Sequence, residues 1–227
     1  GDWSSDVCSS DLMVSVALFL PNIIGYIRAI TGVAAFYFVD THPNVFTVLY
    51  FISYILDALD GVCARKFDQC SHFGAVLDMI CDRFCTCSLY LSLTHLYPQQ
   101  KYYYTLLMIL EIVSHWIQMY SASLVGKSHK AVDKERPFIL RFYYVVPYSL
   151  FFVCLFNEFY LFSNYTLYYI NNTTTKIIVE PIWKFINTWF FPVFVFKQIV
   201  SLVALWDSSK TIIELDERER AERKKAN

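Results

Sequence analysis

Long apolar runs separated by short polar segments make up most of this chain. The runs cover about residues 22–39, 44–65, 72–96, 101–124, 138–162 and 181–206. A helix of about 20 mainly apolar residues is long enough to cross the hydrocarbon core of a bilayer. Because all six runs have about this length, the pattern predicts an all-α, polytopic membrane protein with a six-transmembrane-helix bundle.

The chain before residue 22 differs from these runs. Apolar residues begin at Val14 and are interrupted by Pro21, and proline is favoured in the first turn of a helix. This pattern predicts a short N-terminal interfacial helix ahead of the first span. Residues 1–12 are polar and rich in serine, and they lack the basic and apolar regions of a signal peptide. We interpret them as a non-native leader and expect the native chain to begin at Met13.

The composition agrees with a membrane protein. Hydrophobic residues make up 56% of the chain and aromatic residues 19%, and the mean hydropathy is +0.38. These values exclude an ordinary soluble domain. The formal net charge of −1 hides an asymmetry, because five basic residues lie within the last ten positions. We therefore expect a membrane domain over residues 13–210 and a charged cytosolic tail over residues 211–227.

Basic residues between the spans predict how the helices are oriented. If both termini are cytosolic, the opposite side of the membrane holds only two basic residues between the spans, Lys101 and Lys176. Lys176 lies in the polar segment 163–180. The basic residues on the cytosolic side are then those of the tail and Lys66, Lys127, Lys130, Lys134, Arg136 and Lys210. This is the positive-inside distribution. Glycosylation tripeptides begin at Asn164, Asn171 and Asn172, so we expect segment 163–180 to be a lumenal loop.

Four aspartates interrupt two of the apolar runs. Asp57 and Asp60 are three residues apart, and Asp78 and Asp82 are four apart, so each pair projects from one face of its helix. Each buried carboxylate costs about 2.5 to 3.5 kcal/mol near the centre of a membrane helix. A cation is needed to offset that cost, and ligands that are all oxygen suit hard divalent ions. The sequence therefore predicts a site for Mg²⁺ or Mn²⁺.

Two other residue types leave alternatives open. Arg28, in the first span, is interpreted either as a side chain that snorkels to the interface or as a contact to a nucleotide or phosphate. Most of the seven cysteines lie in apolar runs, which favours small buried thiols over a disulfide framework. Cys81 and Cys85 have a spacing that zinc can use, but no nearby CxxC or histidine pair supports such a site.

The motif from Asp57 to Asp82 has the spacing D-x2-D-G-x2-A-R-x8-G-x3-D-x3-D. It resembles the signature of the CDP-alcohol phosphatidyltransferase family, and every specified position is filled. The resemblance implies that the four aspartates bind metal, with two ions in the site, and that Asp82 is also the general base. It further implies that the CDP-diacylglycerol contacts come from Gly61, Arg65 and Ser71. Gly61 can alternatively serve helix packing alone.

Segments within and beyond this motif resemble the eukaryotic phosphatidylinositol synthases of the same family. These segments are residues 21–28, 73–83, 114–116 and 128–130. The narrower resemblance implies transfer of a phosphatidyl group from CDP-diacylglycerol to myo-inositol with release of CMP. It also implies a homodimer in the endoplasmic reticulum with its active site facing the cytosol, and no nucleic-acid partner. Lys130 and Arg141 are candidates for the acceptor pocket; both can also act as positive-inside anchors.

Two other functions are considered. The motif specifies the CDP half of the reaction, so a relative that uses glycerol phosphate, serine or choline has the same aspartates. A cation channel or transporter lined by those aspartates is an alternative of a different class. A permeation path, however, does not require Gly61, Ala64, Arg65 and Gly74 at their fixed positions.

Overall fold

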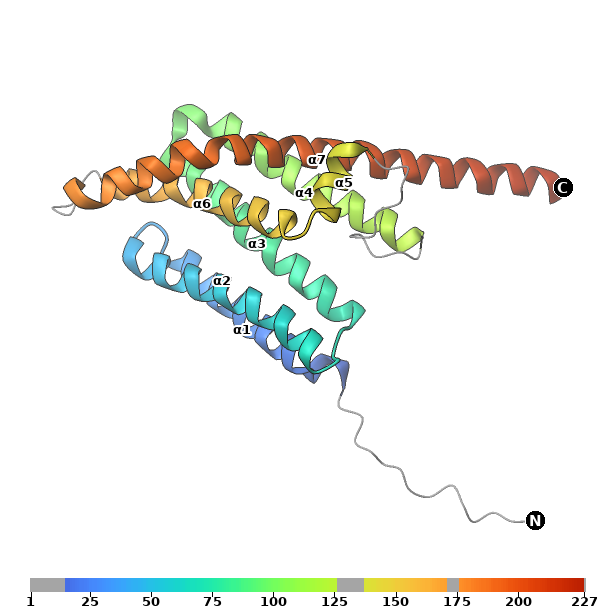
Figure 1. Ribbon diagram of the computed structural model, residues 1–227, viewed down its shortest axis with the longest axis horizontal. Helices are drawn as coiled ribbons and strands as arrows, with labels where there is room; N and C mark the ends of the chain where they lie inside the picture. The colour runs from blue at the N-terminus through green and yellow to red at the C-terminus, as the bar shows by residue number, and fades with distance from the viewer. Residues whose placement is uncertain (1–14, 126–136, 171–175, 227) are drawn as a thin grey trace, which may run out of the picture. The chain divides into compact units, whose positions relative to one another are not determined.

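The computed structural model describes residues 15–125, 137–170 and 176–226, and within these ranges it is all-helical, without strands (Figure 1). The prediction of an all-α protein is confirmed, and the proposed leader, residues 1–12, lies outside the described part. In chain order, the elements are η1 (Val16–Leu18), α1 (Leu20–Tyr37), α2 (Pro43–Lys66), α3 (His72–Leu96), η2 (Pro98–Gln100), α4 (Lys101–Leu124), α5 (Phe138–Val145), α6 (Ser149–Ile170) and α7 (Lys176–Ala226).

The chain divides into two compact units, and the boundary in the sequence falls between Cys85 and Thr86, within α3. In the first unit α1 packs along α2 (Figure 1). The buried side of α1 follows a spacing of three and four residues, as one face of a helix requires. Its buried residues are Pro21, Asn22, Gly25, Arg28, Gly32 and Ala35.

Small residues allow α1 to approach α3 closely. A Cβ atom added to Gly25 would lie 2.8 Å from Cδ2 of Leu77. On the other side of α1, the ring of Phe36 lies 5.3 Å from that of Phe46 and 6.0 Å from that of Tyr50, both on α2. Glycine and aromatic contacts thus hold α1 against both neighbouring helices of the first unit.

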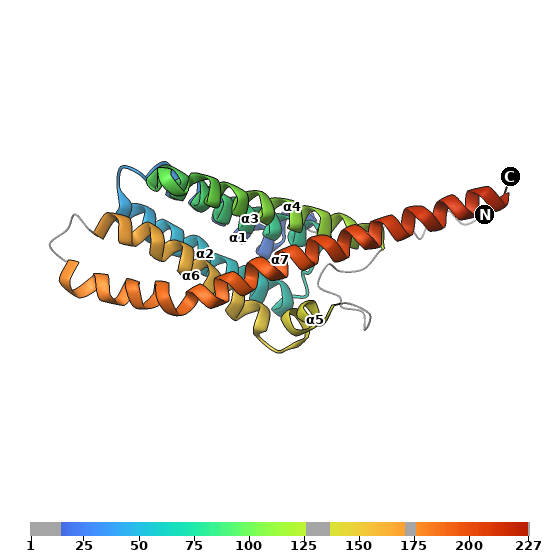
Figure 2. The same cartoon turned by 90° about the horizontal axis from the view of Figure 1, so that it is seen from above.

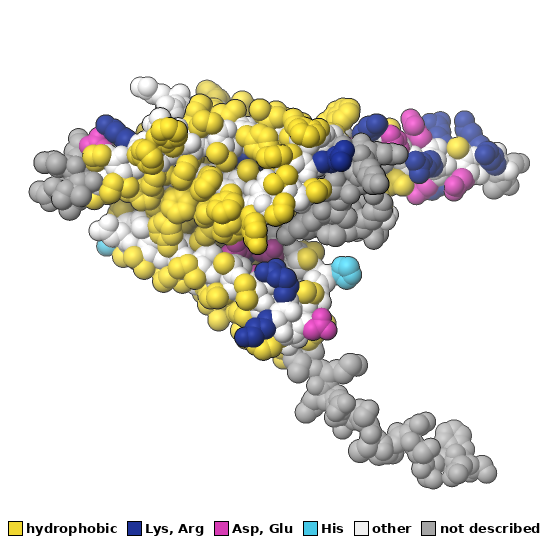
Figure 3. Space-filling model, in the orientation of Figure 1, with side chains coloured by type: hydrophobic (Ala, Val, Ile, Leu, Met, Phe, Trp, Pro, Cys, Tyr) yellow, Lys and Arg dark blue, Asp and Glu magenta, His cyan; other side chains and the backbone are white. Residues whose placement is uncertain are grey.

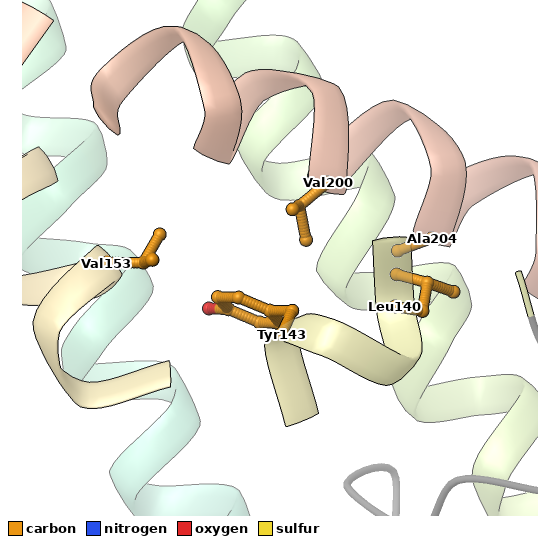
Figure 4. Packing of buried hydrophobic residues seen from close by; sticks show 5 residues of the cluster. All are labelled: Leu140, Tyr143, Val153, Val200 and Ala204. Carbon is orange, nitrogen blue, oxygen red and sulfur yellow. The ribbon is translucent and has the colours of Figure 1, made fainter. Parts of the chain in front are cut away.

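In the second unit α7 packs against α4 and α6, and Figures 1 and 2 both show α6 and α7 side by side. The short helix α5 completes one end of this group. A hydrophobic cluster joins α5 to α6 and α7, and Figure 4 shows its side chains converging from these three helices. The cluster consists of Leu140, Tyr143, Val153, Val200 and Ala204.

The prediction of one helix over residues 138–162 is wrong. The chain bends by 94° between α5 and α6. Pro147 lies in the break and has no N–H to donate, and the residue before a proline is driven towards extended backbone. Val146 accordingly has φ −66° and ψ 125°, and Tyr148 has a positive φ of 63°. The aromatic run therefore contains a helix break that its hydrophobicity alone does not indicate.

The prediction of a lumenal loop over residues 163–180 is also wrong for most of these residues, because they are helical. Helix α6 continues to Ile170, and α7 begins at Lys176. Asn164 lies within α6, where its side-chain amide donates to the carbonyl oxygen of Tyr160 at 2.8 Å. The residues after Asn164 include the apolar run from Leu167 to Ile170, which supports continuation of the helix. The tripeptides at Asn171 and Asn172 begin outside the described residues.

By length and composition, α2 and α7 can each cross a membrane, and the bent pair α5 and α6 qualifies if it is counted as one span. These apolar helices make the chain an integral membrane protein. Helix α7 has 51 residues, which corresponds to about 76 Å at 1.5 Å per residue, far more than the ~30 Å of a hydrocarbon core. Figure 3 shows the charged side chains gathered on its C-terminal part. The described cysteines have free thiols, but of these only Cys81 is buried and Cys70 is exposed.

Candidate functional site

The two aspartate pairs of the motif come together within the first unit. Asp57 and Asp60 lie on the C-terminal half of α2, and Asp78 and Asp82 lie on the N-terminal half of α3. One carboxylate oxygen from each of Asp57, Asp60 and Asp78 lies within 4.8 Å of the others. Carboxylates from the two helices therefore face a common point.

A guanidinium group from α1 occupies the centre of these carboxylates. Nη1 of Arg28 lies 2.7 Å from Oδ1 of Asp57, 2.9 Å from Oδ1 of Asp78 and 3.8 Å from Oδ2 of Asp60. Nη2 of Arg28 pairs with Asp82. Only 4% of the arginine side chain is exposed. The interpretation of Arg28 as a side chain that snorkels to the interface is therefore wrong, because its charge lies inside the protein.

The cluster keeps a negative formal charge. Nη2 of Arg83 lies 3.6 Å from Oδ2 of Asp82, so two guanidinium groups adjoin four carboxylates. Four negative and two positive charges leave a formal charge of −2. Carboxylates this close together repel one another unless cations lie between them. The site can therefore gain stability from a further cation.

The turn between α2 and α3 brings the two pairs together. Phe67 to Ser71 connect the helices, and Asp68 takes a positive φ of 52°, which aspartate tolerates better than most residues. The side-chain oxygen of Gln69 in this turn accepts a hydrogen bond from the N–H of Leu20, at 2.9 Å. The turn is thereby tied to the beginning of α1, the helix that carries Arg28.

Ser71 has a structural role at the start of α3. Its hydroxyl oxygen accepts a hydrogen bond from the N–H of Gly74 at 3.0 Å, which caps the helix N-terminus. A Cβ added to Gly74 would lie 2.8 Å from Oδ1 of Asn22 on α1. This close approach fixes the first turn of α3 against α1, and Asp78 follows one turn later. The cap accounts for Ser71 without a substrate contact.

Gly61 is in a different environment. An added Cβ there would meet only the guanidinium nitrogens of Arg65, at 3.6 and 3.8 Å, which are ordinary van der Waals distances. Among the described residues, helix packing therefore does not require glycine at this position. Arg65 itself is exposed near the end of α2. Asp57, Gly61 and Arg65 follow one another at intervals of four residues along one face of α2.

Of the two candidates for the acceptor pocket, the structure describes only Arg141. Lys130 lies outside the described residues. Arg141 lies on α5 in the second unit, and its side chain is exposed. Its backbone N–H donates to the carbonyl oxygen of Pro137 at 3.1 Å, as the first turn of α5 requires.

Sequence reasoning did not identify the polar contacts inside the second unit. Lys197 on α7 pairs with Glu111 on α4, and both side chains are buried. The Thr86 hydroxyl donates to Oε1 of Glu158 at 2.7 Å. The sequence did contain a signal for these contacts, because charged residues within apolar membrane runs are rare and generally have a partner. Their partners, however, lie far away in the sequence.

The comparison with family models identifies the class of protein. The model described as CDP-alcohol phosphatidyltransferase matches residues 18–176, and this chain belongs to that family. Among curated relatives, a CDP-diacylglycerol--inositol 3-phosphatidyltransferase of Candida albicans is 38% identical, over 92% of this chain and 87% of its own length. The rat protein of the same name is 35% identical over 92% of this chain and 98% of its own. No solved structure gives a significant match.

Proposed function

We propose that this protein transfers the phosphatidyl group of CDP-diacylglycerol to a hydroxyl group of myo-inositol and releases CMP. The observation that carries the proposal is the convergence of Asp57, Asp60 and Asp78 at one point between α2 and α3, with Asp82 paired to the same arginine, Arg28. The names of the relatives support the choice of both substrates.

The aspartate cluster is suited to divalent metal. Its potential ligand atoms are carboxylate oxygens, which Mg²⁺ and Mn²⁺ prefer, and its formal charge is negative. We assign Asp57, Asp60, Asp78 and Asp82 as the residues that hold two ions. When bound, such ions neutralise the charge that develops on the diphosphate and make the attacking hydroxyl more acidic.

Asp82 is proposed to accept the proton of the inositol hydroxyl. The hydroxyl oxygen forms a bond to the phosphorus that carries diacylglycerol, the bond from this phosphorus to the CMP oxygen breaks, and CMP leaves. The guanidinium groups of Arg28 and Arg83 adjoin Asp82 and can orient its carboxylate, and a carboxylate within reach of the hydroxyl can act as a general base.

The CDP group is proposed to bind along the face of α2 that carries Gly61 and Arg65. Gly61 has no Cβ, which leaves space for the nucleotide, and the exposed guanidinium of Arg65 can donate two hydrogen bonds to a diphosphate. The Ser71 hydroxyl accepts from Gly74 but keeps its own proton, so it can also donate to the CDP group. Lys130 and Arg141 remain proposals for the acceptor side.

The topology is proposed to consist of six spans, with α5 and α6 forming one bent span and α1, α3 and α4 completing the set. The basic tail, together with the family resemblance, supports cytosolic termini and a cytosolic active site in the endoplasmic reticulum. The C-terminal end of α2 and the N-terminal end of α3 then face the soluble substrates, while the acyl chains of the lipid stay in the bilayer. A homodimer is proposed from the resemblance alone.

The decisive experiment measures CMP release by the purified full-length protein in detergent, with CDP-diacylglycerol and a panel of alcohols at matched concentrations. Myo-inositol should support the fastest turnover, and EDTA should abolish it. Arg141→Ala should raise the KM for inositol, whereas Arg223→Ala, an exposed arginine on α7, should not. Faster turnover with glycerol 3-phosphate or serine would retain the family reaction but reject inositol. Absence of CMP release with every alcohol would leave the channel alternative.

A further inference from the structure

We propose that Arg28 is the built-in counter-cation of the aspartate cluster. In this view, Arg28 holds the four carboxylates together when metal is absent and competes with metal for their oxygens. The competition rests on the proposed metal site, whereas the role in the metal-free protein does not.

The position of the guanidinium supports this role. Nη1 of Arg28 lies within 3.8 Å of Asp57, Asp60 and Asp78. These are the same three residues whose oxygens form the group that can hold a metal ion. A side-chain cation and a metal ion therefore share one set of carboxylates, and both cannot satisfy all of them at once.

Charge balance explains why the metal-free protein needs Arg28. Arg83 lies beside Oδ2 of Asp82, so loss of Arg28 removes the cation that contacts all four carboxylates. Like charges a few ångströms apart repel strongly where water is scarce. The pairs made by Arg28 connect α1 to α2 and to α3, so loss of the guanidinium both removes these links and increases the repulsion.

A metal ion can enter the cluster from solution, whereas Arg28 is part of the buried protein interior. The side chains of Asp57, Asp78 and Asp82 are 32%, 39% and 35% exposed, so an ion from solution can reach them. Arg28 is almost fully buried, and its own carbonyl oxygen accepts a hydrogen bond from the Ser53 hydroxyl at 3.3 Å. This hydrogen bond helps to hold the backbone of α1 in place, so we expect the Arg28 side chain to move away from the aspartates when metal binds.

The contacts of the guanidinium are consistent with such a movement. Arg28 reaches the carboxylates through its two terminal nitrogens, and its buried Nε has no acceptor among the described residues. Within the described part of the chain, no hydrogen bond of Nε therefore opposes a shift of the guanidinium away from the aspartates.

The test compares wild type with Arg28→Gln and with Arg83→Gln, which removes the same charge at the edge of the cluster. Full-length protein is purified in detergent, Mn²⁺ binding is measured by electron paramagnetic resonance, and Tm is measured in EDTA and with Mn²⁺. Arg28→Gln should bind Mn²⁺ roughly tenfold more tightly, because a competing cation is gone. Its Tm in EDTA should fall by roughly 6 °C or more, and Mn²⁺ should recover most of the loss. Arg83→Gln should show smaller changes in both Mn²⁺ affinity and Tm.

Equal or weaker Mn²⁺ binding by Arg28→Gln would overturn the competition, and an unchanged Tm in EDTA would overturn the counter-cation role. If Arg28→Gln does not fold, the double variant Arg28→Gln with Asp82→Asn provides the test, because removing one carboxylate should restore folding. Failure of this double variant to restore folding would also reject the proposal. None of these readouts depends on the alcohol acceptor, so they remain valid if inositol is the wrong substrate.

Discussion

The ammonium group of Lys197 on α7 forms an ion pair with the carboxylate of Glu111 on α4, with only 4% and 1% of the two side chains exposed. His115, one turn after Glu111, has its Nδ1 at 2.8 Å from the carbonyl oxygen of Glu111. The pair therefore belongs to a polar region that connects two long helices inside the second unit.

Replacement of Lys197 by Met should destabilise the protein by roughly 3 to 5 kcal/mol, because it leaves a buried carboxylate without its cation. The double variant Lys197→Met with Glu111→Met should recover most of that loss, since two apolar side chains need no partner. Thermal unfolding in detergent measures both variants. A double variant less stable than Lys197→Met would contradict the assignment of the pair as a structural link.

Asp82→Asn should lower turnover by about 10² to 10⁴-fold, as expected when a general base is removed, while binding of CDP-diacylglycerol remains measurable. Asp57→Asn should additionally weaken metal-dependent binding of the nucleotide lipid. Single-turnover CMP release and equilibrium binding separate the two effects. Because Asp82 also pairs with Arg28, Tm is measured in parallel to show that the variant is folded. Near-normal turnover by Asp82→Asn would reject its role as the base.

Gly61→Ala and Gly74→Ala form a matched pair with opposite expectations. Gly61→Ala should retain or slightly raise stability, because the added Cβ meets only ordinary contacts and alanine favours a helix, but it should raise the KM for CDP-diacylglycerol. Gly74→Ala should lower stability by about 1 to 3 kcal/mol, because its Cβ would lie 2.8 Å from Oδ1 of Asn22. Tm and KM are measured for both. An unchanged KM in Gly61→Ala would argue against approach of the nucleotide at this position.

The proposed orientation predicts which connections face the lumen. A glycosylation tripeptide carried on a polar insert between α6 and α7 should be modified in microsomes, if the insert extends far enough from the membrane. The same insert between α4 and α5 should not be. Electrophoretic mobility before and after deglycosylation measures the result. Modification of the connection between α4 and α5 would overturn the six-span orientation.

The helices themselves follow from local sequence. The predicted runs 44–65 and 72–96 agree with α2 and α3 to within one residue at each end, because long apolar runs bounded by turn residues leave few other places for a helix to end. The motif likewise predicts that Asp57 and Asp60 share one face, since helical periodicity is independent of the rest of the chain. The break at Pro147 could also have been predicted from proline geometry, although hydrophobicity obscured it.

The partners of the buried charges were decided only by the tertiary structure. Arg28 is 50 residues from Asp78, and Lys197 is 86 residues from Glu111. The sequence shows that such charges need partners in a membrane, but it does not specify which distant helix supplies them. That choice depends on how α1 packs against α3 and how α7 packs against α4. Packing placed the guanidinium of Arg28 among the aspartates, where local pattern had suggested the interface or a phosphate.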